Sequence, residues 1–255
     1  GDSINGEAGD IQIAAGNSND GRGADVFIDA GDSLARGAGT DGGDIVLRAG
    51  NSANDGILDG GSGGGVYLLG GQATGAQSDD NGGPVKIIAG ASDNGHGGSL
   101  TLSSGLGASS GNVQLSSAPV EQDGESGHVA ILTGNSDTGA SGSAVLKTGD
   151  TLAGTAGHIH VLAGAGGSGS GANVVVASGP TDAEEHGGNV AVIASAGALA
   201  SGSIDIQTMA SPESGTVSLS TGTASQAASG AIQLKTGAAE EGRAGDITLK
   251  AGPSN

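Results

Sequence analysis

A short apolar motif recurs along the whole chain of 255 residues and constrains its fold more than any other feature. The motif is G-x-Φ-x-Φ-x-small-G, where Φ is Ile, Val or Leu, and its positions are numbered 1 to 8. It fits the sequence 16 times. The copies begin at residues 9, 24, 43, 64, 83, 98, 111, 127, 142, 157, 172, 188, 202, 215, 230 and 245.

The positions of the motif differ in what they tolerate. Position 5 is Ile, Leu or Val in all 16 copies, and position 3 is aliphatic in 15, with Ala144 as the exception. Position 1 is Gly in 14 copies, position 8 is Gly in 13, and position 7 is always Ala, Ser, Thr or Gly. Side chains at positions 3, 5 and 7 share one side only when the period is two residues, so each copy is predicted to be a short β-strand. The flanking glycines are expected to supply positive φ at the strand ends.

The segments between the copies are turn-rich and show no helical period. Copies begin 13 to 21 residues apart, and no two-residue hairpin turn joins them. Similar strands separated by similar loops predict an all-β fold, a parallel β-solenoid of 16 short strands around a dry aliphatic interior. We expect two strands, about 31 residues, in each coil. Three strands in each coil stay open.

The even-numbered copies differ from the odd-numbered copies, which favours two strands in each coil. The histidines all fall in or just before even-numbered copies: His96, His128, His158, His160 and His186. Residues 1–255 are therefore predicted to form one continuous repeat solenoid. Gly1, followed by Asp2 and Ser3, resembles Gly31 and Gly149 at position 8 of their copies, so we expect a segment of a longer array or of an end-to-end assembly.

Composition narrows the choice of partners. With one Phe, one Tyr and no Trp, the interior has to be built from small branched side chains. The formal net charge of −19, with only eight Lys and Arg, argues against nucleic acid and anionic membranes, because both are bound through basic patches. No apolar run approaches the roughly 18 residues that a membrane span needs. The expected partners are copies of the same chain, and cations or extracellular surfaces.

No residue is assigned a catalytic, cofactor-binding or metal-binding role, and no motif of an enzyme is present, so the chain is not expected to be an enzyme. The sequence contains candidates for two kinds of metal site. His128 and His158 stand at position 2, thirty residues apart, and with His160 offer imidazole ligands for Zn²⁺ or Cu²⁺. Ca²⁺ stays open for acidic residues before the strands and in the loops. These include Asp10, Asp25, Asp44 and Asp246 at position 2, and Asp20, Asp32, Asp41, Asp55, Asp79, Asp80 and Asp93 in loops.

The repeated units, such as "GGDIVLRAG" at 42–50 and "AGDITLKAG" at 244–252, resemble glycine-rich repeat solenoids of secreted surface and adhesin-like proteins. The resemblance spans all 16 copies, implies an extracellular structural or adhesive role, and transfers no functional residue. The expected function is an extracellular structural rod or fibre of stacked coils that assembles with copies of itself, end to end or laterally. The alternative is a surface-binding module: an adhesin stalk, an ice-binding protein or an acidic mineral- or calcium-binding protein. Ice binding is disfavoured because only Thr101 and Thr248 stand at outward position 4.

Overall fold

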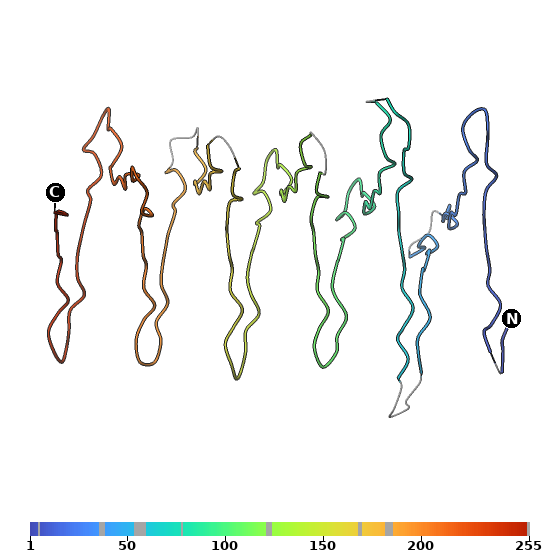
Figure 1. Cartoon of the computed structure of the whole chain (residues 1–255), viewed down its shortest axis with the longest axis horizontal. Helices are drawn as coiled ribbons and strands as arrows, with labels where there is room; N and C mark the ends of the chain where they lie inside the picture. Colours follow the sequence, from blue (N-terminus) through green and yellow to red (C-terminus); the bar gives the residue numbers. More distant parts are fainter. Residues whose placement is uncertain are drawn as a thin grey trace. The chain divides into compact units, whose positions relative to one another are not determined.

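The computed structural model describes residues 1–4, 6–35, 39–53, 60–77, 79–120, 124–167, 170–181 and 186–253. These ranges contain every copy of the motif. Within them the chain forms no helix and no β-strand. The copies run as extended segments, and the residues between them form loops with short bends and turns (Figure 1).

The predicted parallel β-solenoid of 16 short strands, with two strands in each coil, is therefore wrong. A β-strand requires a ladder of backbone hydrogen bonds to a neighbouring segment about 4.8 Å away. The described segments form no such ladder. A two-residue side-chain period shows which side chains share a side, but it does not supply the neighbouring backbone. Glycine-rich segments with two aliphatic side chains each also specify the register of pairing only weakly.

The backbone hydrogen bonds between described residues close loops at their ends, apart from the one that the Asp80 amide donates to the Gln77 carbonyl inside a loop. In nine loops the amide of position 1 donates to the carbonyl of the residue at position 8 before the loop, with Gly1 occupying that place for the first copy. The donor and acceptor pairs are Gly9–Gly1, Ala24–Gly16, Gly43–Gly31, Gly64–Gly50, Gly83–Gly71, Gly98–Gly90, Gly111–Gly105, Gly188–Gly179 and Gly202–Ser195, at 2.8–3.3 Å. We call the two ends of a loop, together with the position 7 side chain before it, the loop base.

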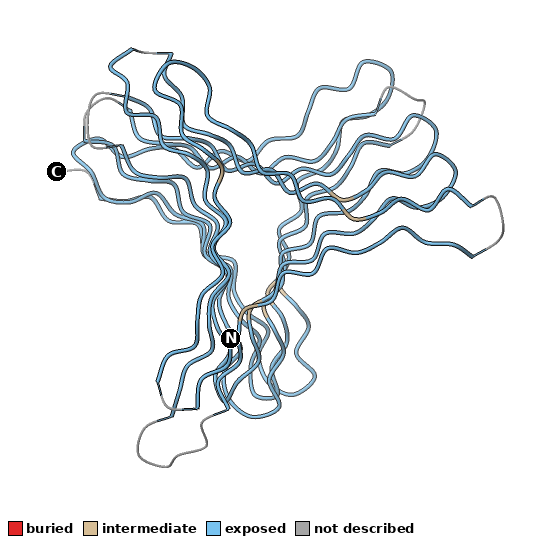
Figure 2. Cartoon of the chain, turned by 90° about the vertical axis from the view of Figure 1, so that its right-hand side faces the viewer, coloured by how far each residue is buried: buried red, intermediate tan, exposed pale blue. Residues whose placement is uncertain are grey.

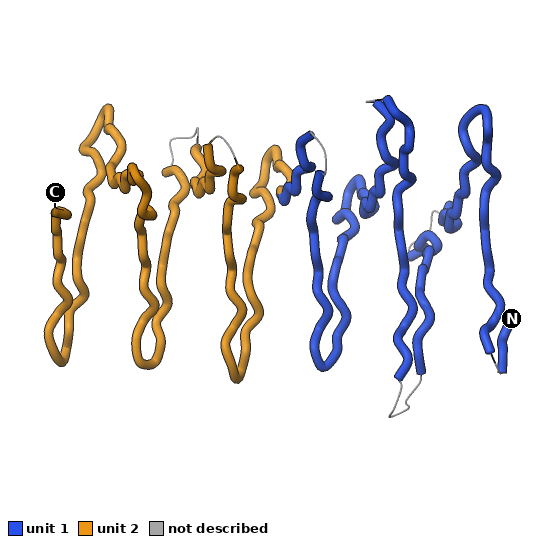
Figure 3. Tube along the Cα trace, viewed as in Figure 1, with its two compact units in different colours: residues 1–131 blue, residues 132–255 orange. Residues whose placement is uncertain are grey.

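The chain divides into two units, Gly1–Ile131 and Leu132–Asn255 (Figure 3). The boundary falls inside the eighth copy, between its positions 5 and 6, and not in a loop. Each unit contains the same local elements, which are extended segments joined by closed loops. That residues 1–255 act as one domain stays a prediction.

Side-chain exposure follows the position in the motif. Eight of the described residues are half-buried and the others are exposed, and all eight stand at position 7 (Figure 2). They are Ala15, Ala30, Ala49, Ala89, Ser104, Thr148, Ala194 and Thr236. The Ile, Val and Leu side chains at position 3 are 49–58% exposed, apart from Ile11, whereas the large hydrophobic side chains at positions 4 and 6 are 70–88% exposed. Exposure therefore alternates with a two-residue period, as the sequence predicts.

The expected dry interior is absent from the described chain. Every large hydrophobic side chain there is at least 47% exposed. The accessible surface is 25,553 Å², whereas a folded monomer of 23.6 kDa exposes about 9,800 Å². An extended segment buries its aliphatic side chains only against a second layer, and the loop bases hold the ends of segments without providing that layer.

Candidate functional site

The loop base is the least exposed place in the described chain, because all the half-buried residues stand at position 7. A Cβ built on Gly43 would lie 3.4 Å from the Cβ of Ala30, and one built on Gly98 would lie 3.5 Å from the Cβ of Ala89. The segment that leaves a loop thus passes directly over the position 7 side chain of the segment that entered it. This approach explains why position 7 is small. At 3.4–3.5 Å an added Cβ would be in ordinary van der Waals contact, so only Gly83 and Gly188, with atoms 3.0 and 3.2 Å away, lack room for one at position 1.

Backbone freedom does not explain these glycines. The glycines with positive φ in the described chain all lie inside loops, and none stands at position 1 or 8. They are Gly6, Gly21, Gly39, Gly154 and Gly242. The expectation that flanking glycines supply positive φ is therefore wrong.

Loop bases differ in whether a backbone hydrogen bond closes them. A threonine at position 7 marks five of the open ones, and the described loop bases after Ser117 and Ala163 also have no such bond. The eight hydrogen-bonded loops that follow a motif copy have Ala, Gly or Ser at position 7. Where position 7 is Thr, the described loop base lacks the hydrogen bond, and the threonine Cγ2 lies 3.6–3.9 Å from the place of a Cβ on the next position 1 glycine. The five threonines are Thr133, Thr148, Thr208, Thr221 and Thr236. The threonine methyl group thus holds the two segments slightly further apart.

The loops themselves begin with a recurring turn that the eight-position motif does not include. The Ser136 hydroxyl accepts a hydrogen bond from the Gly139 amide at 3.0 Å, and Ser92 accepts one from Gly95 at 2.9 Å. Both serines stand two residues after position 8. The same Ser/Thr-x-x-Gly spacing occurs at 3–6, 18–21 and 151–154. Two of these sites form other hydrogen bonds: the Ser18 hydroxyl accepts one from the Asp20 amide at 3.4 Å, and the Thr151 hydroxyl donates one to the Ala153 carbonyl at 3.2 Å. The spacing alone therefore does not determine the turn.

Two of the aspartates considered for Ca²⁺ have arginine partners instead. Arg22 pairs with Asp25 at 2.9 Å, and Arg243 pairs with Asp246 at 3.0 Å. Both pairs belong to the same sequence pattern, G-R-x-x-D, in which the aspartate stands at position 2. Exposed pairs of this kind stabilise a fold by about 0–1 kcal/mol. They orient the residues that leave the loop and reduce the negative charge available to a cation.

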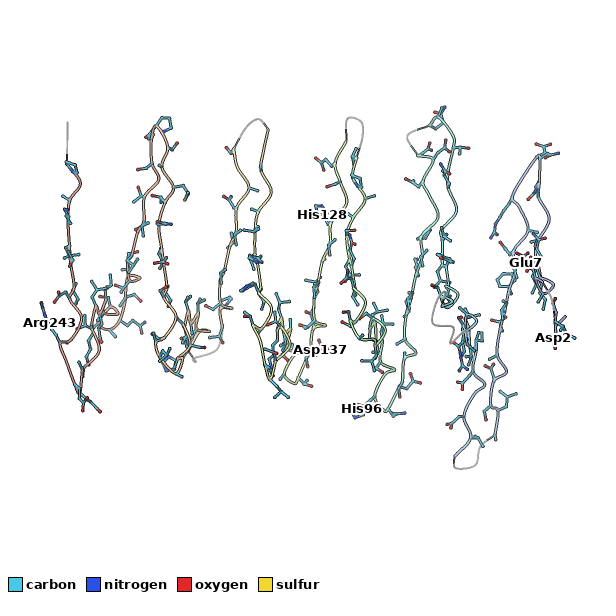
Figure 4. All side chains as sticks on the ribbon, turned by 60° about the horizontal axis from the view of Figure 1, so that its bottom comes forward. Asp2, Glu7, His96, His128, Asp137 and Arg243 are labelled. Carbon is cyan, nitrogen blue, oxygen red and sulfur yellow. The ribbon has the colours of Figure 1, made fainter. Side chains whose placement is uncertain are left out.

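The histidines weighed for Zn²⁺ or Cu²⁺ are only partly brought together. The His158 and His160 rings lie with their centroids 5.9 Å apart at an interplanar angle of 61°. His128 belongs to the other unit and has no ring contact among the described residues. In Figure 4, His128 also lies well apart from His96 and Glu7 of its own unit.

The described residues contain no group of three or more His, Asp or Glu side chains that would hold a metal ion, and Asp55 lies outside them. No pocket is found in this part of the chain. A helix of the length and apolarity required to cross a membrane is also missing from it.

What the described geometry offers chemically is a set of exposed aliphatic segments, closed polar loops and one pair of imidazoles. Compared with known proteins, the chain matches no protein-family model, no curated protein and no solved structure.

Proposed function

We propose that this chain is an extracellular structural protein that forms rods or fibres by association with copies of itself. The observation that carries the proposal is the exposure of the aliphatic face, which we define as the side chains at positions 3 and 5. This face recurs in every copy of the motif, and all of its described Ile, Val and Leu side chains are at least 49% exposed.

The exposed aliphatic face leaves a large favourable free energy unused in the single chain. Complete burial of a Val, Leu or Ile side chain stabilises by about 1.5–3 kcal/mol, and about half of that is still available at position 3. The accessible surface exceeds that of a folded monomer by roughly 16,000 Å². A stable interface needs only about 1,200–2,000 Å² in total. A small fraction of the exposed surface is therefore enough for tight association.

A second copy of the chain is the partner that fits this surface best. The two large side chains of the aliphatic face stand two positions apart in 15 of the 16 copies, with Ala144 as the exception. Any of these copies on one chain therefore matches any of them on another, and this self-complementarity allows growth beyond a dimer. The net charge of −19 opposes association, so it should limit assembly at low ionic strength.

The closed loops support a structural role for the segments between them. In nine loops the hydrogen bond at the loop base fixes where the segments on either side begin and end. The extracellular location rests on the resemblance of the repeated units to glycine-rich proteins of cell surfaces.

Sedimentation velocity and negative-stain electron microscopy of the purified full chain, over a wide range of concentrations, test the proposal. The expected result is a concentration-dependent shift from monomer to large species that are visible as rods or filaments. A single species of monomer mass at every concentration would overturn the proposal. A monomer that co-sediments with ice, a mineral or cell surfaces would also overturn it, in favour of the surface-binding alternative.

A further inference from the structure

We propose that His158 and His160 form a two-imidazole binding site for a first-row divalent cation, and that Cu²⁺ is the cation bound most strongly. The two histidines stand at positions 2 and 4 of the tenth copy, so the two-residue period places them on one side of the segment. Ile159 between them is 49% exposed, the lowest value among the position 3 side chains, which agrees with its pointing to the other side.

The separation of the rings is close to what chelation needs. Two imidazoles that bind one metal at about 2.0–2.1 Å have ring centroids roughly 5 Å apart. The His158 and His160 centroids are 5.9 Å apart, and their interplanar angle of 61° gives an edge-to-face arrangement. Both side chains are exposed, so rotation about their side-chain bonds is free to close the remaining distance.

The segment that carries the pair leaves a loop base of the threonine kind, which no backbone hydrogen bond closes in the described structure. The place of a Cβ on Gly157 lies 3.6 Å from the Cγ2 of Thr148, so this segment passes beside Thr148 directly before His158.

The chemistry of the surroundings favours a cation of this class. Imidazole nitrogens suit Cu²⁺, Ni²⁺ and Zn²⁺, and Cu²⁺ is bound most strongly of the divalent first-row metals. The net charge of −19 raises the local concentration of cations around the chain. Neither histidine forms an ion pair with a carboxylate in the described structure. Because both ligands belong to one chain, the site does not depend on self-association.

The eighth copy provides a matched control. His128 stands at position 2 there, as His158 does in its own copy, but position 4 is Ala130. His128→Gln therefore removes an equivalent single imidazole, and Ala130→His creates the same spacing at a second place.

The experiment is a Cu²⁺ titration of the full chain, followed by electron paramagnetic resonance and circular dichroism. We expect one site with two nitrogen ligands in the unchanged chain and in His128→Gln. His158→Gln and His160→Gln should each weaken Cu²⁺ binding at least tenfold. Mutation of a residue that only hydrogen-bonds to a metal ligand lowers metal affinity about 10–100-fold, and removal of the ligand itself should lower it at least as much. Ala130→His should add a second site.

Two results would overturn the site. One is a Cu²⁺ signal that survives His158→Gln and His160→Gln at unchanged affinity, since the metal would then be bound elsewhere, for example at the terminal amine. The other is an equal loss in His128→Gln, which would show that dispersed histidines bind the metal without pairing.

Discussion

Of two adjacent isoleucines in the fifth copy, one belongs to the aliphatic face and the other lies on the opposite side of the segment. Ile87 stands at position 5 and is 56% exposed, whereas Ile88 stands at position 6 and is 84% exposed. If copies associate through the aliphatic face, Ile87→Ser weakens assembly and Ile88→Ser leaves it nearly unchanged. The two variants have the same composition and the same change in hydrophobicity, so they control for each other.

The exposures set the size of the expected effect. With 56% of its surface still exposed, Ile87 has about 0.8–1.7 kcal/mol left to gain on burial, taking about 1.5–3 kcal/mol for a whole side chain. Its loss should raise the dissociation constant about 4- to 18-fold for each Ile87 contact in the assembly. If exposed area alone governed assembly, Ile88 would matter more, because it has about 1.3–2.5 kcal/mol to gain. The prediction therefore differs from the result expected if exposed area alone drove assembly, in which case Ile88→Ser would have the larger effect.

Sedimentation velocity over a concentration series measures the threshold of assembly for the unchanged chain and both variants. Equal thresholds for the two variants, or a higher threshold for Ile88→Ser, would refute association through positions 3 and 5. Circular dichroism of each variant below the threshold checks that the single chain is unchanged.

Three further results are expected. In Gly70→Ala, the new Cβ overlaps the Gly83 carbonyl oxygen, so the hydrogen bond of the Gly83 amide is lost. The exchange rate of the Gly83 amide proton, measured by NMR, should then rise about 2- to 13-fold. Gly71→Ala is the control and should leave this rate unchanged, because the space around its Cβ is open. Ala89→Thr should convert a hydrogen-bonded loop base into the threonine kind and speed exchange of the Gly98 amide by the same factor, and unchanged exchange would contradict the role given to position 7. Added salt should lower the assembly threshold measured by light scattering, because it screens the −19 net charge; a threshold that rises with salt would point to assembly held by ion pairs.

The motif predicts correctly which side chains share one side of a segment, but it does not predict which other segment lies next to it. The alternation of large aliphatic and other residues indicates a two-residue period, and the exposures of Val85, Ile87 and Ile88 follow it. A strand also needs a neighbouring backbone, and a period within one segment contains no information about that neighbour. The dry interior failed for the same reason, because it was inferred from strands stacked in pairs.

The loop base was visible in the sequence, although its cause was not. Position 1 glycine and position 7 Ala, Ser or Thr are regular features of the motif, but either a turn or a close approach explains a glycine equally well from sequence. The backbone angles exclude the turn, and the distances require glycine for lack of room only at Gly83 and Gly188. The pairing of His158 with His160 was predictable from their spacing, whereas the pairing of His158 with His128 depended on the number of strands in a coil.

Loops of very different length share the same hydrogen-bonded loop base, and this separates two tasks along the chain. The loop between Gly105 and Gly111 has five residues and that between Gly50 and Gly64 has thirteen, yet each is closed by the same backbone hydrogen bond, at 3.2 and 2.9 Å. Closing a longer flexible loop costs little more, since doubling its length adds only about 0.6 kcal/mol. Loops can therefore lengthen and change without disturbing the segments that they join. Under self-association, the segments would supply the constant surface through which copies meet, and the acidic loops would face solvent and carry whatever differs from one copy to the next.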